Sequence, residues 1–378
     1  MSDIYLDNSS TTKPYPEVVS KVLEMVTDKY GNPSSLHRLG MESKQELEKA
    51  RQIIADSFSV TASEIYFTSG GTESDNLAIM GACLANASNG KRIVTTVAEH
   101  AAVTKTIRNF KKQGWEVIYV PAPGGVLDLE EMKREINEET VLVSAMLVNN
   151  EIGSIFPIEQ IKQVIKQKKS PALLHCDAVQ GYGKINFTAE SIGADLISIS
   201  AHKIHGVKGS GALYVKNGTK MFTSMFGGGQ EHGLRSGTES TPLIAAFGEA
   251  VRIIFSNMEN NIYQMAELRD YCMDSIVMGL PEAVIHSSKQ GAPHIVNFSL
   301  PGYSNREVVE FLDTKGIYIS SAAACKSNHS RGPSMLESLG ISRELANSAL
   351  RVSFSSMNTK EEIDILVNTL IEYVRKEK

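Results

Sequence analysis

The chain of 378 residues has few cysteines, a single tryptophan and no long uninterrupted apolar run. The four cysteines lie far apart, without a Cys-x-x-Cys pair, which argues against a disulfide framework, and no metal site is predicted. The most apolar stretch, Leu243 to Phe255, is interrupted by Glu249 and Arg252 and is too short to cross a bilayer. The segment Met1 to Asp7 lacks the basic start and apolar run of a secretory signal. We therefore expect a cytoplasmic protein without a membrane segment.

The chain also has no excess of basic residues. Lysine and arginine total 38 against 43 aspartates and glutamates, which gives a net charge of -5. This balance argues against direct nucleic-acid binding, which requires a basic surface. A hydrophobic content of 42% in a chain of this length is typical of a globular protein with two packed domains.

The middle of the chain alternates strand-like and helix-like segments. The expected strands are short and continuously apolar, and longer amphipathic segments separate them, which is typical of a mostly parallel sheet with helices on both faces. Strands are predicted over Ile65–Thr68, Arg92–Val97, Glu116–Val120, Val141–Val148, Leu173–Asp177, Asp195–Ser200 and Ala212–Val215. Helices are predicted over Glu73–Leu84, Ala101–Lys112, Leu129–Ile136 and Ile158–Lys168.

The pattern changes after about Ser240. A long helical stretch, Leu243 to Met278, is followed by alternating segments at His294–Leu300 and Leu350–Phe354 and by a last helix over Lys360–Val374. We expect a large domain over residues 14–250 and a smaller α+β domain formed by residues 1–13 and 251–378.

Three cysteines, Cys83, Cys176 and Cys272, lie in apolar segments and are expected to be small buried residues. Cys325 differs, because it follows Ser320 to Ala324 and precedes a polar stretch with glycine and proline. We expect Cys325 on an exposed loop of the smaller domain.

A strand that runs into two glycines and then a helix is found at residues 65–75. Gly70 and Gly71 allow close approach of a ligand, and the helix start offers free N–H groups to a phosphate. Thr72 adds a hydroxyl group. The alternative is a plain helix cap made by Thr72 with Asp75.

Asp177 ends a buried apolar strand, where a carboxylate is unfavourable unless it is paired. A protonated pyridine nitrogen would suit it, and Gln180 could bond the phenolic oxygen of the same ring. The alternative is a helix N-cap.

Lys203 stands just past the next apolar strand, where a desolvated amine can be made nucleophilic for a Schiff base. Ser200 and His202 precede it and could reach a phosphate. A lone lysine would more often be a solvated loop residue. The presence of Asp177 one crossover upstream favours a site residue instead. An acid for the pyridinium and a lysine for the aldehyde are the two groups that pyridoxal phosphate requires.

Further polar residues follow other predicted strands or interrupt one. His100 could stack on a flat ring and move protons, and Asn150 also follows a strand. The glycine-rich segment 227–238, which contains Thr238, suits an anion or is a flexible surface loop. Arg351 suits a substrate carboxylate, although a lone arginine is more often a surface charge.

Taken together and in this order, the motifs resemble those of the class V aminotransferase family, and specifically its cysteine desulfurases of the NifS/IscS type. The resemblance covers essentially the whole chain. The segments that carry it are Tyr5–Thr12, Gly31–His37, Thr68–Asn76, Glu99–His100, Asn150–Gly153, Asp177–Gly181, Ser200–Lys203, Arg235–Thr238, Cys325 and Leu350–Phe354.

The resemblance implies a fold-type-I enzyme that binds pyridoxal 5'-phosphate and works as a homodimer. Lys203 would bond the cofactor aldehyde, and His100 would stack on the ring and move protons. The cofactor-binding residues it implies are Gly71, Thr72, His100, Asn150, Asp177, Gln180, Ser200, His202, Lys203 and Thr238 of the partner subunit.

The resemblance also implies a reaction. Arg351 and Asn150 would bind L-cysteine, and Cys325 would take its sulfur as a persulfide, leaving L-alanine. The sulfur would pass to an acceptor protein, such as an iron–sulfur scaffold or a tRNA-thiolation enzyme. Ser9 and Ser10 depart from the family pattern, which usually has two alanines there.

Two alternatives stay open at this point. A related lyase of the same family, acting on selenocysteine or another amino acid, would depend less on Cys325. A non-catalytic sulfur-relay scaffold is the other, and the presence of both Lys203 and Cys325 argues against it.

Overall fold

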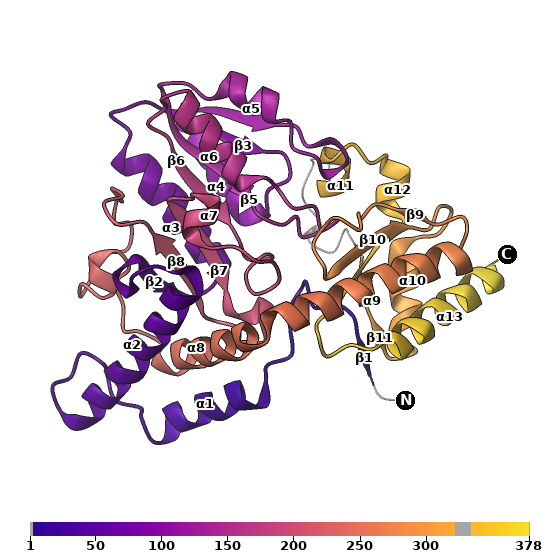
Figure 1. Cartoon of the computed structure of the whole chain (residues 1–378), viewed down its shortest axis with the longest axis horizontal. Coiled ribbons are helices and arrows are strands. Elements are labelled where there is room, and N and C mark those ends of the chain that lie inside the picture. Colours follow the sequence, from indigo (N-terminus) through magenta and orange to yellow (C-terminus); the bar gives the residue numbers. More distant parts are fainter. Residues whose placement is uncertain (1–2, 322–333, 378) are drawn as a thin grey trace.

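The computed structural model describes residues 3–321 and 334–377 (Figure 1). Its strands are β1 (Ile4–Tyr5), β2 (Ile65–Thr68), β3 (Arg92–Thr96), β4 (Glu116–Val120), β5 (Thr140–Met146), β6 (Leu173–Asp177), β7 (Leu196–Ser200), β8 (Gly211–Val215), β9 (Val284–Ile285), β10 (Ile295–Ser299), β11 (Ile317–Tyr318), β12 (Ser320–Ser321) and β13 (Ala349–Ser353).

Its helices are α1 (Pro16–Thr27), α2 (Arg38–Phe58), α3 (Gly71–Ala85), α4 (Ala101–Lys112), α5 (Leu129–Glu135), α6 (Ile158–Gln167), α7 (Ala189–Ile192), α8 (Thr241–Ser256), α9 (Met258–Gly279), α10 (Asn305–Asp313), α11 (Met335–Ser338), α12 (Arg343–Asn347) and α13 (Lys360–Glu377). The strands and helices predicted between residues 65 and 215 are confirmed to within a residue or two at each end.

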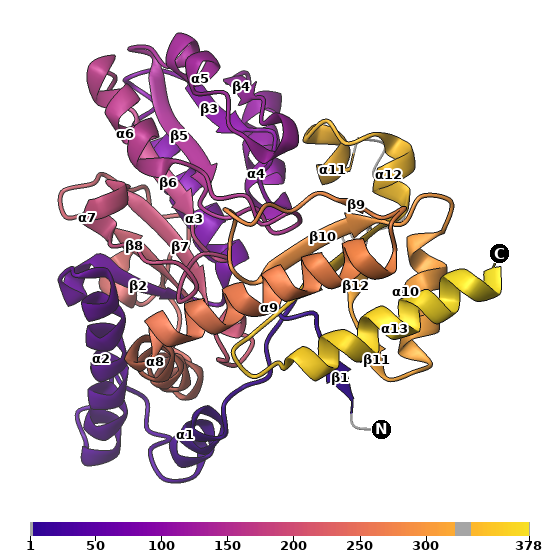
Figure 2. The same ribbon diagram turned by 45° about the vertical axis from the view of Figure 1, so that its right-hand side comes forward.

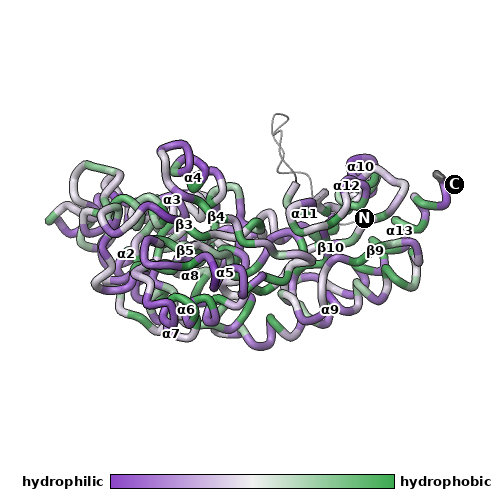
Figure 3. The backbone as a smooth tube through the Cα atoms, turned by 90° about the horizontal axis from the view of Figure 1, so that it is seen from above, coloured by the Kyte–Doolittle hydropathy of each residue, from purple (hydrophilic) through white to green (hydrophobic). Residues whose placement is uncertain are grey.

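The larger sheet has the strand order β2-β8-β7-β6-β5-β3-β4. Neighbouring strands from β7 through β6, β5 and β3 to β4 are parallel, and β8 is antiparallel to both of its neighbours, β2 and β7. Every residue of β5 is buried, because helices cover both faces of the sheet. Figure 3 shows these strands between a layer that contains α3 and α4 and a layer that contains α5, α6, α7 and α8. The prediction of a mostly parallel α/β sheet is confirmed.

A second hydrophobic core lies beside smaller sheets. β12, β13, β10 and β9 form an antiparallel sheet, and β1 pairs in parallel with β11. Ile4 and Leu6 of the N-terminal segment are buried in the same cluster as Leu268, Phe298 and Leu370. The view in Figure 2 shows α9 and α13 along one side of this part of the molecule. The boundary at residue 250 stays a prediction.

The helical stretch predicted over Leu243 to Met278 as one segment is two helices. α8 ends at Ser256 and α9 begins at Met258. Asn257 between them has φ -136° and ψ 27°, which is not helical and breaks the run of backbone hydrogen bonds. None of the helices in the described part of the chain is long and apolar enough to cross a membrane. Cys83, Cys176 and Cys272 are buried, as predicted.

Candidate active site

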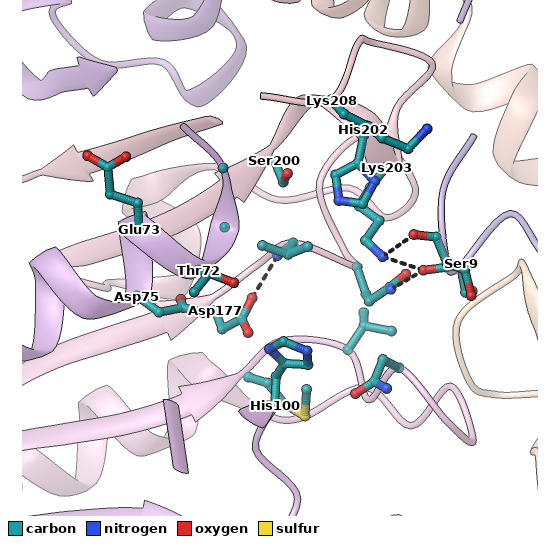
Figure 4. A pocket seen from close by; sticks show the side chains of 18 of the residues that line it. Ser9, Thr72, Glu73, Asp75, His100, Asp177, Ser200, His202, Lys203 and Lys208 are labelled. Carbon is teal, nitrogen blue, oxygen red and sulfur yellow. Dashed lines mark hydrogen bonds between the residues drawn. The ribbon is translucent and has the colours of Figure 1, made fainter. Parts of the chain in front are cut away.

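A cavity of about 530 Å³ opens where β3, β5, β6 and β7 end, the edge of a parallel sheet at which ligands usually bind. It collects residues from segments far apart in the sequence (Figure 4). The predicted site residues that line it are Gly71, Thr72, His100, Asn150, Asp177, Gln180, Ser200, His202, Lys203 and Arg351. Figure 4 shows Asp177 and His100 on one side of the cavity and Lys203, pointing toward Ser9, on the other.

One wall of the cavity is the start of α3. Gly70 precedes the helix with φ 149°, and no side chain caps it, so the alternative of a plain helix cap made by Thr72 with Asp75 is wrong. A Cβ on Gly71 would lie only 2.7 Å from Cγ2 of Val179, so glycine is required for this packing. The free N–H groups at the start of a 15-residue helix make this wall favourable for an anion.

Asp177 ends β6 and is 5% exposed. Its Oδ1 accepts a hydrogen bond from the backbone N–H of Val179 at 3.0 Å. Burial and the negative charge of Asp75 raise the pKa of Asp177 and His100 lowers it, with a net pKa of about 7. A cation at this carboxyl group would therefore be strongly favoured.

A buried polar cluster behind Asp177 was missed by sequence reasoning. Nε2 of His175 lies 3.5 Å from Oδ1 of Asp75 and 3.0 Å from the hydroxyl of Ser198. The other ring nitrogen lies 2.9 Å from the hydroxyl of Ser144. The sequence did contain an indication of this cluster. His175 and Asp177 are two positions apart in an otherwise apolar strand, so their side chains point to the same face of the sheet.

The amine of Lys203 is held by the N-terminal segment. It donates to the carbonyl oxygens of Ser9 at 2.5 Å and Ser10 at 2.8 Å. Nε2 of Gln180 donates to the same Ser9 oxygen at 2.8 Å. Residues 9 and 10 therefore form part of the cavity, a role that sequence reasoning did not assign to them.

Both predicted histidines are neutral at physiological pH. Nδ1 of His100 accepts a hydrogen bond from the N–H of Ala102 at 3.2 Å, and burial lowers the pKa of His100. Nδ1 of His202 lies 3.1 Å from the hydroxyl of Thr11, and burial and the charge of Lys203 lower the pKa of His202 to about 4. A neutral imidazole can stack on a ring or exchange a proton.

Arg351, on β13, is 5% exposed, so the alternative of a surface charge is wrong. Nη1 donates to the carbonyl oxygen of Asn150 at 2.7 Å. Nη2 donates to Oδ1 of Asp7 at 3.2 Å and to the hydroxyl of Ser10 at 2.9 Å. The Ser10 hydroxyl, one of the departures from the family pattern, thus bonds the guanidinium directly.

The segment 227–238 does not present a free cation to an anion within this chain. The Arg235 guanidinium is bonded to Glu73, with Nε 2.7 Å from Oε1, so this side chain is not available to an anion. The expectation that Thr238 binds the phosphate held by a partner subunit stays a prediction. Thr238 is exposed and does not line the cavity of its own chain. Cys325 lies outside the described residues.

The chain matches the family model for class-V aminotransferases over residues 4–366. The chain belongs to this family. Among its relatives, a "Cysteine desulfurase IscS" of Clostridium botulinum strain Hall is 37% identical over 99% of this chain and 94% of the relative. The protein of the same name from Methanosarcina thermophila is 36% identical over 99% of this chain and 92% of that protein.

Solved structures agree with this class-V membership. A "NifS-like protein" has a TM-score of 0.93 and 35% identity, and the match covers 99% of each chain. A NifS-like protein from Rickettsia africae has a TM-score of 0.85 and 29% identity over 98% of this chain and 99% of that chain. The chain is therefore a class-V, fold-type-I enzyme that depends on pyridoxal phosphate.

The residues of the cavity fit this cofactor. The wall formed by Gly71 suits a phosphate, the carboxyl group of Asp177 suits a pyridinium, and the amine of Lys203 suits an aldehyde. Oδ1 of Asn150 is buried and has no hydrogen-bond partner among the described residues, so it can accept a bond from a ligand. A volume of about 530 Å³ is ample for the cofactor together with an amino acid.

Proposed function

We propose that the protein is a cysteine desulfurase that converts L-cysteine to L-alanine and holds the sulfur as a persulfide on Cys325. The observation that carries the proposal is the convergence of Lys203, Asp177 and Arg351 on one cavity. This set offers an amine for an aldehyde, an acid for a ring nitrogen and a guanidinium for an amino-acid carboxylate. The names of the relatives, cysteine desulfurases over nearly the full length, support the same reaction.

The cofactor would be held from several sides. Lys203 would bond its aldehyde, Asp177 would pair with the pyridine nitrogen, and His100 would stack on the ring. Phosphate would be bound by Gly71, Thr72, Ser200 and His202, joined by Thr238 of the partner subunit in a homodimer. Asn150 and Gln180 would contact the ring substituents. Bound pyridoxal phosphate supplies an electron sink that lowers the barriers to removing the Cα proton and breaking the C–S bond.

The protein would contribute orientation and proton transfer. Arg351 and Asn150 would fix the carboxylate of cysteine, so that the Cα–H bond lies within reach of the Lys203 amine. A neutral His100, with its lowered pKa, can accept a proton and return it to the product. Burial of Asp177 excludes water from its carboxyl group, which strengthens its attraction for a cation.

Cys325 would attack the substrate sulfur as a thiolate, with its own sulfur forming the new S–S bond while the substrate C–S bond breaks. The persulfide would then pass to an acceptor protein. We propose a cytoplasmic acceptor that serves iron–sulfur cluster assembly or tRNA thiolation.

The test is to feed purified holoenzyme L-cysteine with a thiol reductant and to measure alanine and sulfide together. We expect the two products in equal amounts, and their loss in Cys325→Ser. The buried Cys272→Ser is the matched control and should keep the activity. Undiminished turnover of cysteine by Cys325→Ser would contradict the persulfide role and favour a selenocysteine lyase or another lyase of the family.

A further inference from the structure

Glu151 is a buried carboxyl group that the proposed reaction does not use. It lies in the turn after β5, its side chain is 5% exposed, and Oε2 has no hydrogen-bond partner among the described residues. Oε1 accepts a hydrogen bond from Nδ2 of Asn150 at 2.9 Å and lies 3.5 Å from Nη1 of Arg351. One oxygen atom therefore links the residue proposed to contact the cofactor with the residue proposed to bind the substrate.

The backbone around Glu151 is fixed. The N–H groups of Glu151 and Ile152 both donate to Oδ1 of Asn149 at 3.0 Å. Arg351 is tied to the same turn, because its Nη1 donates to the carbonyl oxygen of Asn150 at 2.7 Å. The carboxyl group and the guanidinium are therefore held side by side by main-chain contacts as well as by charge.

Negative charge around Arg351 would be in excess once a substrate carboxylate binds. Arg351 already faces two acids, Glu151 at 3.5 Å and Asp7 at 3.2 Å, and Lys203 is the other cation whose charge acts on Glu151. A substrate carboxylate would be a third acid on one guanidinium, and an uncompensated buried charge is unfavourable. Protonation of one acid relieves the excess. The acid most removed from water is Glu151, at 5% exposure against 19% for Asp7.

We propose that Glu151 is a positioning residue that pairs with Arg351 in the substrate-free enzyme and takes up a proton from solvent when a substrate carboxylate binds. This inference rests on the proposed function, because it takes Arg351 as the carboxylate site. Burial already raises the pKa of Glu151 to about 7, with Asp7 adding to the rise and Arg351 and Lys203 opposing it. A ligand carboxylate adds negative charge and raises the pKa of Glu151 further, so carboxylate affinity falls as pH rises above 7.

The probe is propanoate, which carries the carboxylate but has neither the amine nor the thiol of cysteine. Its binding to the holoenzyme is measured by calorimetry between pH 6 and pH 9, in buffers of different ionisation enthalpy. For the wild type we expect the Kd to rise up to about tenfold per pH unit above pH 7, with up to about one proton taken up per ligand. For Glu151→Gln, which keeps the bond from Asn150 but cannot ionise, we expect a Kd that does not change with pH and tighter binding at pH 8.

The matched control is Asp7→Asn, which removes the more exposed acid from the same guanidinium and should keep the pH dependence. Equal pH dependence in the wild type and Glu151→Gln would overturn the proposal, as would a failure of propanoate to bind the wild type. If Glu151→Gln does not fold, the proposal is tested by the proton uptake of the wild type on binding propanoate. An uptake near zero at pH 8 would contradict the proposal. The desulfurase assignment is tested separately, because it fails if the enzyme forms no alanine from cysteine. Propanoate binding does not depend on that reaction.

Discussion

Oδ1 of Asp75 lies 3.5 Å from Nε2 of His175, and both side chains are fully buried behind Asp177. Burial raises the pKa of Asp75 to about 7 and lowers that of His175 to about 4. Around pH 6 the pair is therefore neutral, with the proton on the carboxyl group rather than on the imidazole. A cation bound in the cavity beside Asp177 would favour the ionised form of that carboxyl group over its neutral form.

Asp75→Asn tests this distribution of protons through stability. In the folded cofactor-free protein Asp75 keeps its proton up to about pH 7, whereas in the unfolded chain it ionises near its usual value, so wild-type stability falls as pH rises between them. Asparagine does not titrate. Between pH 4 and pH 7 the free energy of unfolding of the variant should therefore rise relative to that of the wild type by about 2–4 kcal/mol. Urea unfolding of both proteins measures the difference. A difference in stability between Asp75→Asn and the wild type that stays the same from pH 4 to pH 7 would contradict the prediction.

Asp177→Asn removes the proposed counter-charge of the ring nitrogen. Asparagine can still accept the hydrogen bond from Val179, so the local fold should be kept. Because the pyridine nitrogen would lose its acid, we expect the rate of alanine formation to fall by about 10²–10⁴-fold and the cofactor absorbance to change with pH differently from the wild type. An unchanged rate would exclude the proposed pairing.

Arg351→Lys tests the carboxylate site. Lysine keeps the charge but loses the planar fork, so we expect the KM for cysteine to rise about 10–100-fold while cofactor absorbance is retained. Ser10→Ala removes a single hydrogen bond to the same guanidinium and should raise the KM by less than about tenfold. Steady-state kinetics on the two variants measure both KM values. A larger rise in the KM for Ser10→Ala than for Arg351→Lys would contradict the prediction.

The Arg51–Glu231 pair is predicted to stabilise the fold without acting in the reaction. The two groups are buried and their contact is bidentate, with distances of 2.7 and 2.9 Å, and Glu231 anchors the segment 227–238 to Arg51 of α2. Arg51→Met leaves Glu231 buried without a counter-charge, with only the hydrogen bond from the Phe67 N–H, so we expect a loss of about 3–5 kcal/mol in the free energy of unfolding. Arg38→Met, which breaks an exposed pair with Glu42, should change it by less than about 1 kcal/mol. Similar losses in the two variants, measured by urea unfolding, would contradict the prediction.

The larger sheet and the residues of the cavity could be predicted from the sequence, because buried parallel strands are continuous apolar runs and their ends carry the polar residues. Asp177, Lys203 and His100 each follow such a run, and the geometry of parallel strands brings them to one edge. The break at Asn257 could not be predicted, because the apolar pattern continues across it and only the backbone angles show the turn.

The parts of the site that depend on long-range contacts were also out of reach. The carbonyl oxygens of Ser9 and Ser10 accept hydrogen bonds from Lys203, more than 190 residues away, through backbone atoms that every residue has. Glu151 lies within a recognised motif, but only the folded chain shows that its carboxyl group contacts both Asn150 and Arg351. Arg235 pairs with Glu73, and neither sequence segment indicates this contact.

The claim on which the account depends is that Lys203 carries the cofactor. Borohydride reduction of the holoenzyme fixes pyridoxal phosphate permanently to whichever amine holds it, and peptide mass spectrometry then identifies that residue. We expect the added pyridoxyl mass on Lys203 alone. Labelling of the neighbouring Lys208 or of the buried Lys184 in its place, with Lys203 unmodified, would contradict it.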